Sequence, residues 1–318
     1  MATPGTAVLD DIQRHVWAAK ILVEVQLSAS ESRQFDKSEP YMEELITDIA
    51  SITPGTGHFS YDGVPLRWHL PIGLLYDLHI LATQDVSHDD SGPSTGSKHK
   101  PESFRLTIHF SQSYRSEHEN QLIDPTPDVV HDAYINSVKE ADFLRTGTAK
   151  PIMSLSATDS KLLWSATQES DSAVFSRIYQ SLLPSDAPWR SIPLRVYLPS
   201  TPNDAVPESE VPSGSTKSPT PQGQIRVIQS QITPYVAATS TPGASQLRTA
   251  GAGQGTPQTL GSALHSLLPS LFPSRRTPIL AKALLHGTVL PMNAVLEEVA
   301  SKACYADGWV NVVVAITT

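Results

Sequence analysis

The chain has 318 residues and a formal net charge of −9, and 39% of its residues are hydrophobic. It contains no run of 18 or more apolar residues, which excludes a membrane-spanning helix, and the acidic balance argues against broad binding to nucleic acid. A single cysteine excludes an internal disulfide or a paired-cysteine metal site and favours a reducing compartment such as the cytoplasm.

The start of the chain predicts a short amphipathic helix over 6–19. Val8, Ile12 and Val16 fall on one stripe at helical spacing, and Thr6 is a candidate N-cap. A terminal helix this short needs a surface to lie on. It either binds a partner through Val8, Ile12 and Val16 or docks on its own chain, and the sequence leaves both readings open. The first 11 residues lack the basic and apolar regions of a secretory signal.

Residues 20–113 predict a small α+β domain. Alternating apolar residues from Ile21 to Leu27 predict its first strand. Asp62-Gly63 between two alternating runs predicts a hairpin, because a type I′ turn needs positive φ at both positions. A helix over 72–81 and a strand over 104–110 follow. The segment 42–56 offers only a short helix, so the domain is expected to lack its second strand and to be abridged there.

Residues 122–184 predict a helix-rich domain. Tyr134, Val138 and Ala141 mark the buried face of a helix over 128–145, and a second helical region covers 158–183. No alternating apolar pattern interrupts these helices, so this part of the chain is expected to contain no strand.

Residues 190–318 predict strand, strand, helix, strand, helix and strand in that order. This order describes a β-grasp, or ubiquitin-like, domain. Two segments rich in Pro, Ser, Thr, Gly and Gln, 199–224 and 238–257, interrupt the pattern. They bury too little apolar surface to offset the entropy of ordering and are predicted to be disordered inserts.

The sequence contains no motif of a known catalytic centre. Its histidines near the predicted hairpin match no known ligand spacing, so packed or surface histidines are expected rather than a metal site; they are His58, His69, His79 and His109. Cys304 is an alternative thioester nucleophile, but no nearby acid–base partner marks it, and a lone cysteine is more often a small core residue. We therefore expect no catalytic residue, no metal and no cofactor.

One continuous run closely resembles a signature of the autophagy protein 5 family. It reads Tyr-Asp-Gly-Val-Pro-Leu-Arg-Trp-His-Leu-Pro-Ile-Gly-Leu-Leu-Tyr-Asp-Leu over 61–78. Three further segments resemble the family in the same order: Val138-Lys139-Glu140-Ala141-Asp142, Ile192-Pro193-Leu194-Arg195-Val196-Tyr197, and His286-Gly287 followed by Pro291 and Leu296. The family carries a longer stretch, with a strand and a helix, where this chain has 42–56.

The resemblance implies an α+β fold with two ubiquitin-like domains flanking a helix-rich domain, together with a short N-terminal helix. It also implies a non-catalytic acceptor and scaffold in the cytoplasm and, peripherally, on the preautophagosomal (phagophore) membrane. The family accepts the ubiquitin-like autophagy protein 12 from E1-like and E2-like enzymes, binds autophagy protein 16 and promotes lipidation of autophagy protein 8. Two other functions stay open: an unconjugated ubiquitin-like adaptor, and an enzyme that uses Cys304.

The resemblance assigns Lys139 as the isopeptide acceptor. From the residues alone, Lys139 lies one position after Val138, about 100° round the helix from the predicted buried stripe. On such a flank the stem can pack while the amine stays in water. Without the resemblance, this lysine reads as a solvated surface charge.

Overall fold

The computed structural model describes residues 14–32, 43–44, 57–67, 69–82, 103–119, 122, 126–183, 189–198, 225–236 and 255–317. The chain divides into two compact units, described separately below. One consists of Ala19–Tyr134, Tyr197–Val227 and Val313–Thr318; the other consists of Met1–Ala18, Ile135–Val196 and Ile228–Val312.

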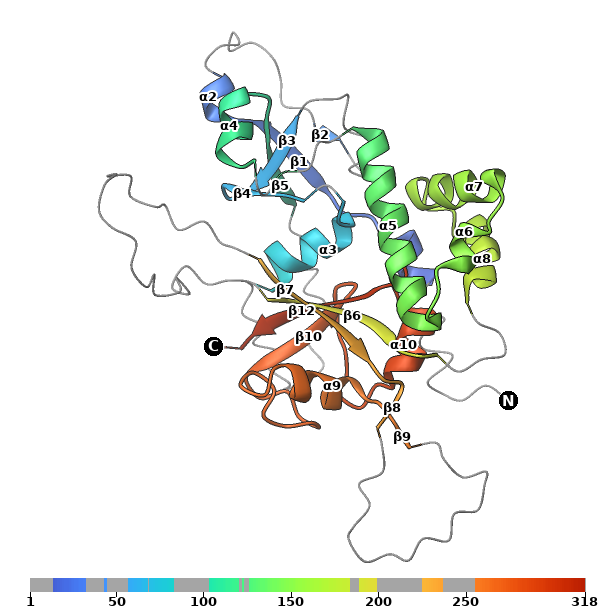
Figure 1. The fold of residues 1–318 in the computed structure, drawn as a ribbon. Helices are drawn as coiled ribbons and strands as arrows, with labels where there is room; N and C mark the ends of the chain where they lie inside the picture. Colours follow the sequence, from blue (N-terminus) through green and yellow to red (C-terminus); the bar gives the residue numbers. More distant parts are fainter. Residues whose placement is uncertain are drawn as a thin grey trace, which may run out of the picture. The chain divides into compact units, whose positions relative to one another are not determined.

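The first sheet has five strands in the order β2-β1-β5-β3-β4 (Figure 1). The central pair β1 and β5 is parallel, and Val25 is the register partner of Leu106. The other pairs are antiparallel. The strands are β1 (Val23–Leu27), β2 (Glu43–Glu44), β3 (His58–Tyr61), β4 (Val64–Pro65) and β5 (Phe104–His109).

The predicted hairpin joins β3 to β4. Its turn has positive φ at both central residues, 46° at Asp62 and 79° at Gly63, which confirms the prediction from the Asp-Gly pair. The helix predicted over 72–81 forms as α3 (Ile72–Tyr76), which continues as a π-helical turn, η2 (Asp77–Leu81). Together with the sheet, these elements enclose an apolar core of Val23, Phe59, Leu66, Leu75, Ile80, Phe104 and Leu106.

A second strand is present in the first domain, contrary to the prediction. Glu43–Glu44 forms β2, which pairs antiparallel with β1 at Val23 and Glu24. Of the segment 42–56, only residues 43 and 44 lie within the described chain, and they are extended rather than helical. The local spacing of apolar residues predicted a helix there. It could not predict the strand, because pairing with β1 is a long-range interaction that local spacing does not report.

The described part of the first unit also contains two short helices, α2 (Ala29–Ser32) and α4 (Gln112–Glu117). The buried carboxylate of Glu31 accepts hydrogen bonds from the backbone amides of Phe110 and Ser111 at 2.8–3.1 Å. Glu31 therefore satisfies backbone donors between the end of β5 and the start of α4.

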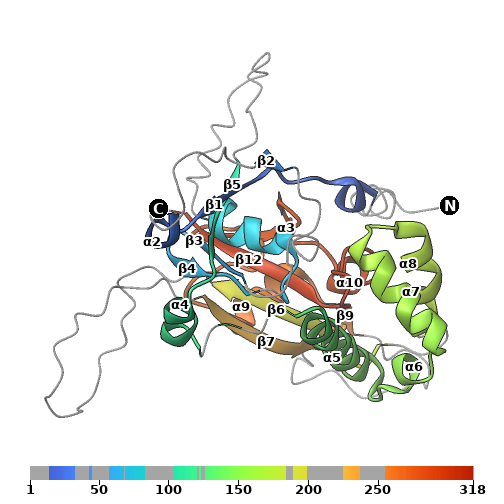
Figure 2. The same cartoon turned by 90° about the horizontal axis from the view of Figure 1, so that it is seen from above.

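The helix-rich region is confirmed, and its described residues form four α-helices: α5 (Pro127–Thr146), α6 (Lys150–Met153), α7 (Ala157–Gln168) and α8 (Ser172–Tyr179). A 3₁₀ turn, η3 (Gln180–Leu182), follows them. Ser156 and Asp171 cap the amino ends of α7 and α8. These two helices lie side by side (Figures 1 and 2).

The second sheet also has five strands, in the order β11-β10-β12-β6-β7. Numbered within each domain, the strands of both sheets follow the same order, 2-1-5-3-4, which bears out the expectation of two ubiquitin-like domains. The strands are β6 (Ile192–Leu198), β7 (Arg226–Ile232), β10 (Ala281–Leu285), β11 (Thr288–Val289) and β12 (Val310–Ile316). Helices α9 (Leu260–Leu267) and α10 (Leu296–Lys302) occupy the predicted places between strands.

The predicted N-terminal helix and inserts are only partly described. Residues 14–18 are helical, whereas Val8 and Ile12 lie outside the described residues, as does the insert 199–224. The second insert was predicted over 238–257. Its last two residues form β9 (Thr256–Pro257), which pairs with β8 (Tyr235–Val236), and 238–254 lies outside the described residues.

Candidate functional site

Lys139 lies in the middle of α5 on a half-buried flank. The helix holds this position because two of its other faces are packed against separate parts of the chain. The contacts on those two faces fix the orientation of α5 and therefore the direction in which the Lys139 side chain points.

One face of α5 packs against the second ubiquitin-like domain. The Arg195 guanidinium on β6 donates to Ser137 Oγ at 3.0 Å, Asp307 Oδ2 at 3.3 Å and Glu140 Oε2 at 3.1 Å. It also stacks on Trp309, with the guanidinium carbon 3.8 Å from the ring centre. Trp309 is fully buried and packs against Ala141 and Leu144. This network fixes α5 to the strand and turn that it contacts.

Asp307 is the largely buried acid of this network, with its side chain 13% exposed. Burial raises the pKa of its carboxyl group, while the adjacent Arg195, the Ser137 hydroxyl and the Trp309 amide oppose that rise. Ser137 Oγ donates to Asp307 Oδ2 at 2.8 Å, and the Trp309 amide donates to Oδ1 at 3.2 Å. The charge on Asp307 therefore depends on partners from α5, β6 and its own turn.

A second face of α5 packs against α6 and α8. Asp142 is 1% exposed, and its Oδ2 accepts from the Ile152 amide at 3.2 Å. Arg145 is also buried, and its guanidinium carbon lies 5.6 Å from the centre of the Tyr179 ring. Asp142 points toward α6, and the Arg145 guanidinium lies between Tyr179 of α8 and the turn that contains Gly308.

The two acids that flank Lys139 are therefore engaged elsewhere, Glu140 by Arg195 and Asp142 by α6. Among the residues that the structure describes, no carboxylate lies within 4.0 Å of the Lys139 amine. The amine has no general base beside it within this part of the chain.

Cys304 sits in a setting unsuited to a nucleophile. Burial raises the pKa of its thiol, although the Arg145 charge and the Tyr179 hydroxyl oppose this. The sulfur lies 3.4 Å from the Tyr179 hydroxyl oxygen, and burial raises the pKa of that tyrosine well above its ordinary value. No histidine or carboxylate donates to or accepts from the thiol in the described chain, which disfavours the thioester-enzyme alternative.

Of the four histidines named from the sequence, His58 and His79 are buried and His109 is half-buried. His58 and His109 are register partners on β3 and β5, and His109 Nε2 lies 2.8 Å from Ser60 Oγ. Burial lowers the pKa of His109, and it lowers the pKa of His79 to about 4. His69 is exposed on the turn before α3. No group of three or more potential ligand side chains gathers within the described chain.

The N-terminal helix is anchored by a residue that the sequence pattern missed. Trp17 packs against Phe175 of α8, with ring centres 4.8 Å apart. Val16, from the predicted stripe, is half-buried beside it. Trp17 lies off that stripe, and only its size and apolar character could have singled it out.

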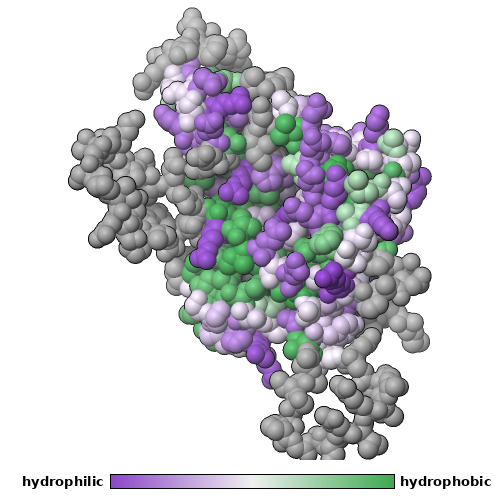
Figure 3. Space-filling view, in the orientation of Figure 1, coloured by the Kyte–Doolittle hydropathy of each residue, from purple (hydrophilic) through white to green (hydrophobic). Residues whose placement is uncertain are grey.

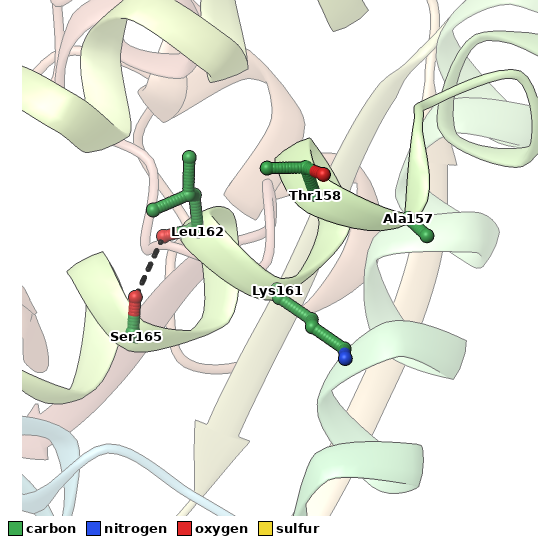
Figure 4. Close-up of a pocket in the computed structure, with 5 residues that line it drawn as sticks. All are labelled: Ala157, Thr158, Lys161, Leu162 and Ser165. Atoms are coloured by element: carbon green, nitrogen blue, oxygen red, sulfur yellow. Dashed lines mark hydrogen bonds between the residues drawn. The ribbon is translucent and has the colours of Figure 1, made fainter.

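An open pocket of about 330 Å³ lies along α7, lined by Ala157, Thr158, Lys161, Leu162 and Ser165 (Figure 4). Ser165 Oγ donates to the Leu162 carbonyl at 3.3 Å, and the Lys161 amine extends away from both. The lining residues include no acid, histidine or thiol. The pocket therefore offers no catalytic constellation.

Searching the described residues for a helix long and apolar enough to cross a membrane identifies none. Comparison with protein families gives three matches in chain order. "Autophagy protein ATG5, UblA domain" matches 42–110, "alpha-helical bundle region" of the same protein matches 127–185, and its "UblB domain" matches 191–314.

Curated relatives match over nearly the whole chain. "Autophagy protein 5" of Aspergillus clavatus is 42% identical over 331 residues, covering 97% of this chain and 98% of the relative. The Emericella nidulans protein of the same name is 39% identical over 339 residues, with the same coverage. The crystal structure of Kluyveromyces marxianus Atg5 is similar in fold, with a TM-score of 0.63 and 16% identity, covering 96% of this chain and 99% of that one.

Proposed function

Because the chain belongs to the autophagy protein 5 family, and so acts in autophagy, we propose that it is a non-catalytic acceptor joined through Lys139 to autophagy protein 12. The observation that carries the proposal is the position of Lys139. It lies on the flank of a helix that is fixed on two other faces, with both neighbouring acids engaged elsewhere. A lysine held on a rigid element loses less freedom when it enters a reaction.

The reaction is attack of the Lys139 ε-amine on a thioester carried by an E2-like enzyme. The amine nitrogen forms a bond to the carbonyl carbon, the carbon–sulfur bond breaks, and the enzyme thiol leaves with the proton that the amine loses. The product is an isopeptide bond. Since lysine amines are largely protonated at neutral pH, the enzyme must assist in removing the proton.

The conjugate is proposed to act as a scaffold. It binds autophagy protein 16, with Val8, Ile12 and Val16 of the N-terminal helix contributing to that interface. It promotes lipidation of autophagy protein 8 from the cytoplasmic side of the preautophagosomal membrane, where it associates peripherally. E1-like and E2-like enzymes bind the chain transiently. The fixed helix and the two ubiquitin-like sheets are surfaces suited to such assembly.

The test is the Lys139→Arg variant expressed in cells. Arginine keeps the charge and helical preference but is not a nucleophile, so the fold is expected to persist and the conjugate to disappear. An immunoblot under reducing conditions reads the shifted band. Lys150→Arg and Lys161→Arg serve as matched controls on neighbouring helices, and both are expected to keep the band. A reductant-resistant band from Lys139→Arg would refute the acceptor assignment, and absence of any shifted band from the native chain would favour the unconjugated adaptor.

A further inference from the structure

We propose that the loop between α9 and β10 of the second ubiquitin-like domain, residues 273–280, docks on an anionic phospholipid bilayer. This inference rests on the proposed peripheral association with the preautophagosomal membrane, and it names the part of the chain that makes the contact. Three observations carry it: the sign of the charge in this part of the sequence, the exposure of the side chains of the loop, and the anchoring of its backbone.

Charge is unevenly distributed along the sequence. No Asp or Glu occurs between Glu210 and Glu297, although the whole chain has a net charge of −9. The same stretch contains six Lys or Arg residues, and two of them, Arg275 and Arg276, are consecutive in the loop. A local excess of basic side chains attracts an anionic surface even when the whole protein is acidic, because salt screens exposed charges beyond about 8–10 Å.

The basic pair of the loop is followed by an exposed apolar pair. Ile279 is 56% exposed and Leu280 is 45% exposed, and in the described chain no other two large apolar residues that are consecutive in sequence are both exposed. Arg275 and Arg276 are exposed as well, and within the described residues neither guanidinium lies within 4.0 Å of a carboxylate. The visible surface over α5, by contrast, is largely hydrophilic (Figure 3). Binding to a bilayer interface depends on attraction to anionic headgroups and on burial of apolar area, and this loop carries groups of both kinds.

The backbone of the loop is held against its own domain, so that the exposed side chains point outward. Phe272, which precedes the loop, is fully buried, and its carbonyl oxygen lies 2.8 Å from His265 Nδ1 of α9. The carbonyl oxygen of Arg275 lies so close to Gly261 that a Cβ on this glycine would clash with it. At its other end the loop enters β10 at Ala281, which is buried. A surface that is ordered before it binds loses less conformational entropy on binding.

An anionic bilayer matches this loop better than a nucleic acid or a protein does. The loop contains no aromatic residue on which a base could stack, whereas the acyl boundary of a bilayer, about 5–10 Å deep, accepts aliphatic side chains. A specific protein interface buries about 800 Å² on each partner, which is more than eight residues supply. A bilayer needs no such area of complementary shape, because lipids rearrange around the inserted side chains.

The test is co-sedimentation of the purified full-length chain with vesicles of phosphatidylcholine that contain about one-third phosphatidylserine. We expect the native chain to bind these vesicles, and to bind vesicles of phosphatidylcholine alone at least about tenfold more weakly. Arg275→Glu combined with Arg276→Glu is expected to weaken binding to the anionic vesicles at least about tenfold. Lys150→Glu combined with Lys161→Glu makes the same change of charge at exposed positions on α6 and α7, and is expected to change binding by less than about twofold.

The apolar pair is tested at constant charge. Ile279→Ser combined with Leu280→Ser is expected to weaken binding about tenfold, because two aliphatic side chains no longer enter the bilayer. Ile279→Phe, which keeps an apolar side chain at the same position, is expected to bind at least as tightly as the native chain. Met153→Ser is the control, since Met153 is 67% exposed on α6, and it should leave binding unchanged.

Three results would overturn the inference. The first is equal binding of anionic vesicles by the native chain and both double variants of the loop, and the second is no binding by the native chain. The third is loss through the arginine variant alone, with vesicles displaced by single-stranded RNA, which would assign the loop to a nucleic acid. Each of these results leaves the acceptor role standing, because the Lys139→Arg immunoblot tests that role separately.

Discussion

Arg195 and Trp309 form a cation–π pair in which the guanidinium carbon lies 3.8 Å from the centre of the indole ring. The pair is extended by the Trp309 indole nitrogen, which donates to the Ser137 carbonyl at 3.1 Å. A residue of β6 and the residue preceding β12 thus meet on the helix that carries Lys139. Four predictions test this arrangement and the features around it.

Arg195→Met is expected to lower the free energy of unfolding by about 3 kcal/mol, because it leaves the largely buried Asp307 carboxylate without its cationic partner. Denaturant unfolding measures the loss. Asp307→Asn, added to Arg195→Met, should recover part of it by removing the stranded charge. Arg105→Met breaks an exposed pair with Glu24 and is the control, expected to leave stability unchanged within error.

Gly308→Ala is expected to destabilise the chain by at least about 2 kcal/mol. Gly308 has a φ of 83°, and a Cβ there would clash with the Arg145 guanidinium. Gly73→Ala is the matched control, since a Cβ there meets nothing within 4 Å. Because Gly73 lies within α3, alanine should leave stability unchanged or raise it slightly. Equal melting temperatures for the two variants would contradict the clash.

Acidification is expected to destabilise the first ubiquitin-like domain through His79. Burial lowers its folded-state pKa to about 4, below the unfolded value near 6.5, so the unfolded state binds more protons between these values. Stability is therefore retained above pH 6.5 and falls as the pH drops toward 4. From pH 7 to pH 5 this histidine costs about 2 kcal/mol. Denaturant titrations of the native chain and of His79→Phe at both pH values measure the difference; His69→Gln, at an exposed site, should follow the native chain.

Val16→Asp is expected to weaken capture of autophagy protein 16 by at least about tenfold while the chain stays folded, because a charge on the N-terminal stripe opposes an apolar contact. Pull-down with the purified partner is the measurement. Trp17→Ala is the comparison, since Trp17 faces Phe175 of its own chain. It should increase hydrogen exchange in 14–18. Capture that is insensitive to Val16→Asp would remove this residue from the interface.

The sequence predicted correctly those turns and strands whose conformation depends on residues close together in the chain. The Asp62-Gly63 turn and the alternating strands β6 and β12 follow from neighbouring residues. β2 was mistaken for part of a helix because its strand character comes from pairing with Val23 and Glu24, some 20 residues earlier. The π-helical turn after α3 likewise has no sequence signal that periodicity captures.

The surroundings of Lys139 were less predictable than its place on a helix. Its flank position follows from the spacing of Tyr134, Val138 and Ala141. That Glu140 would be held by Arg195 and Asp142 by Ile152 depends on tertiary contacts 55 and 10 residues away. Arg195 gave one available signal, since it is a lone charge within an apolar strand.

The packing of α5 also has a consequence for synthesis of the chain on the ribosome. Ser137 donates to Asp307, which follows it by 170 residues, and the buried Trp309 comes two residues later still. A nascent chain therefore displays the lysine-bearing sequence long before the tryptophan that completes its packing has been translated. Prematurely terminated products that lack Asp307 and Trp309 would carry Lys139 on a helix with one face unpacked. Ala141 and Leu144 would then be exposed to chaperones and proteases before a conjugating enzyme meets Lys139 on a fixed helix.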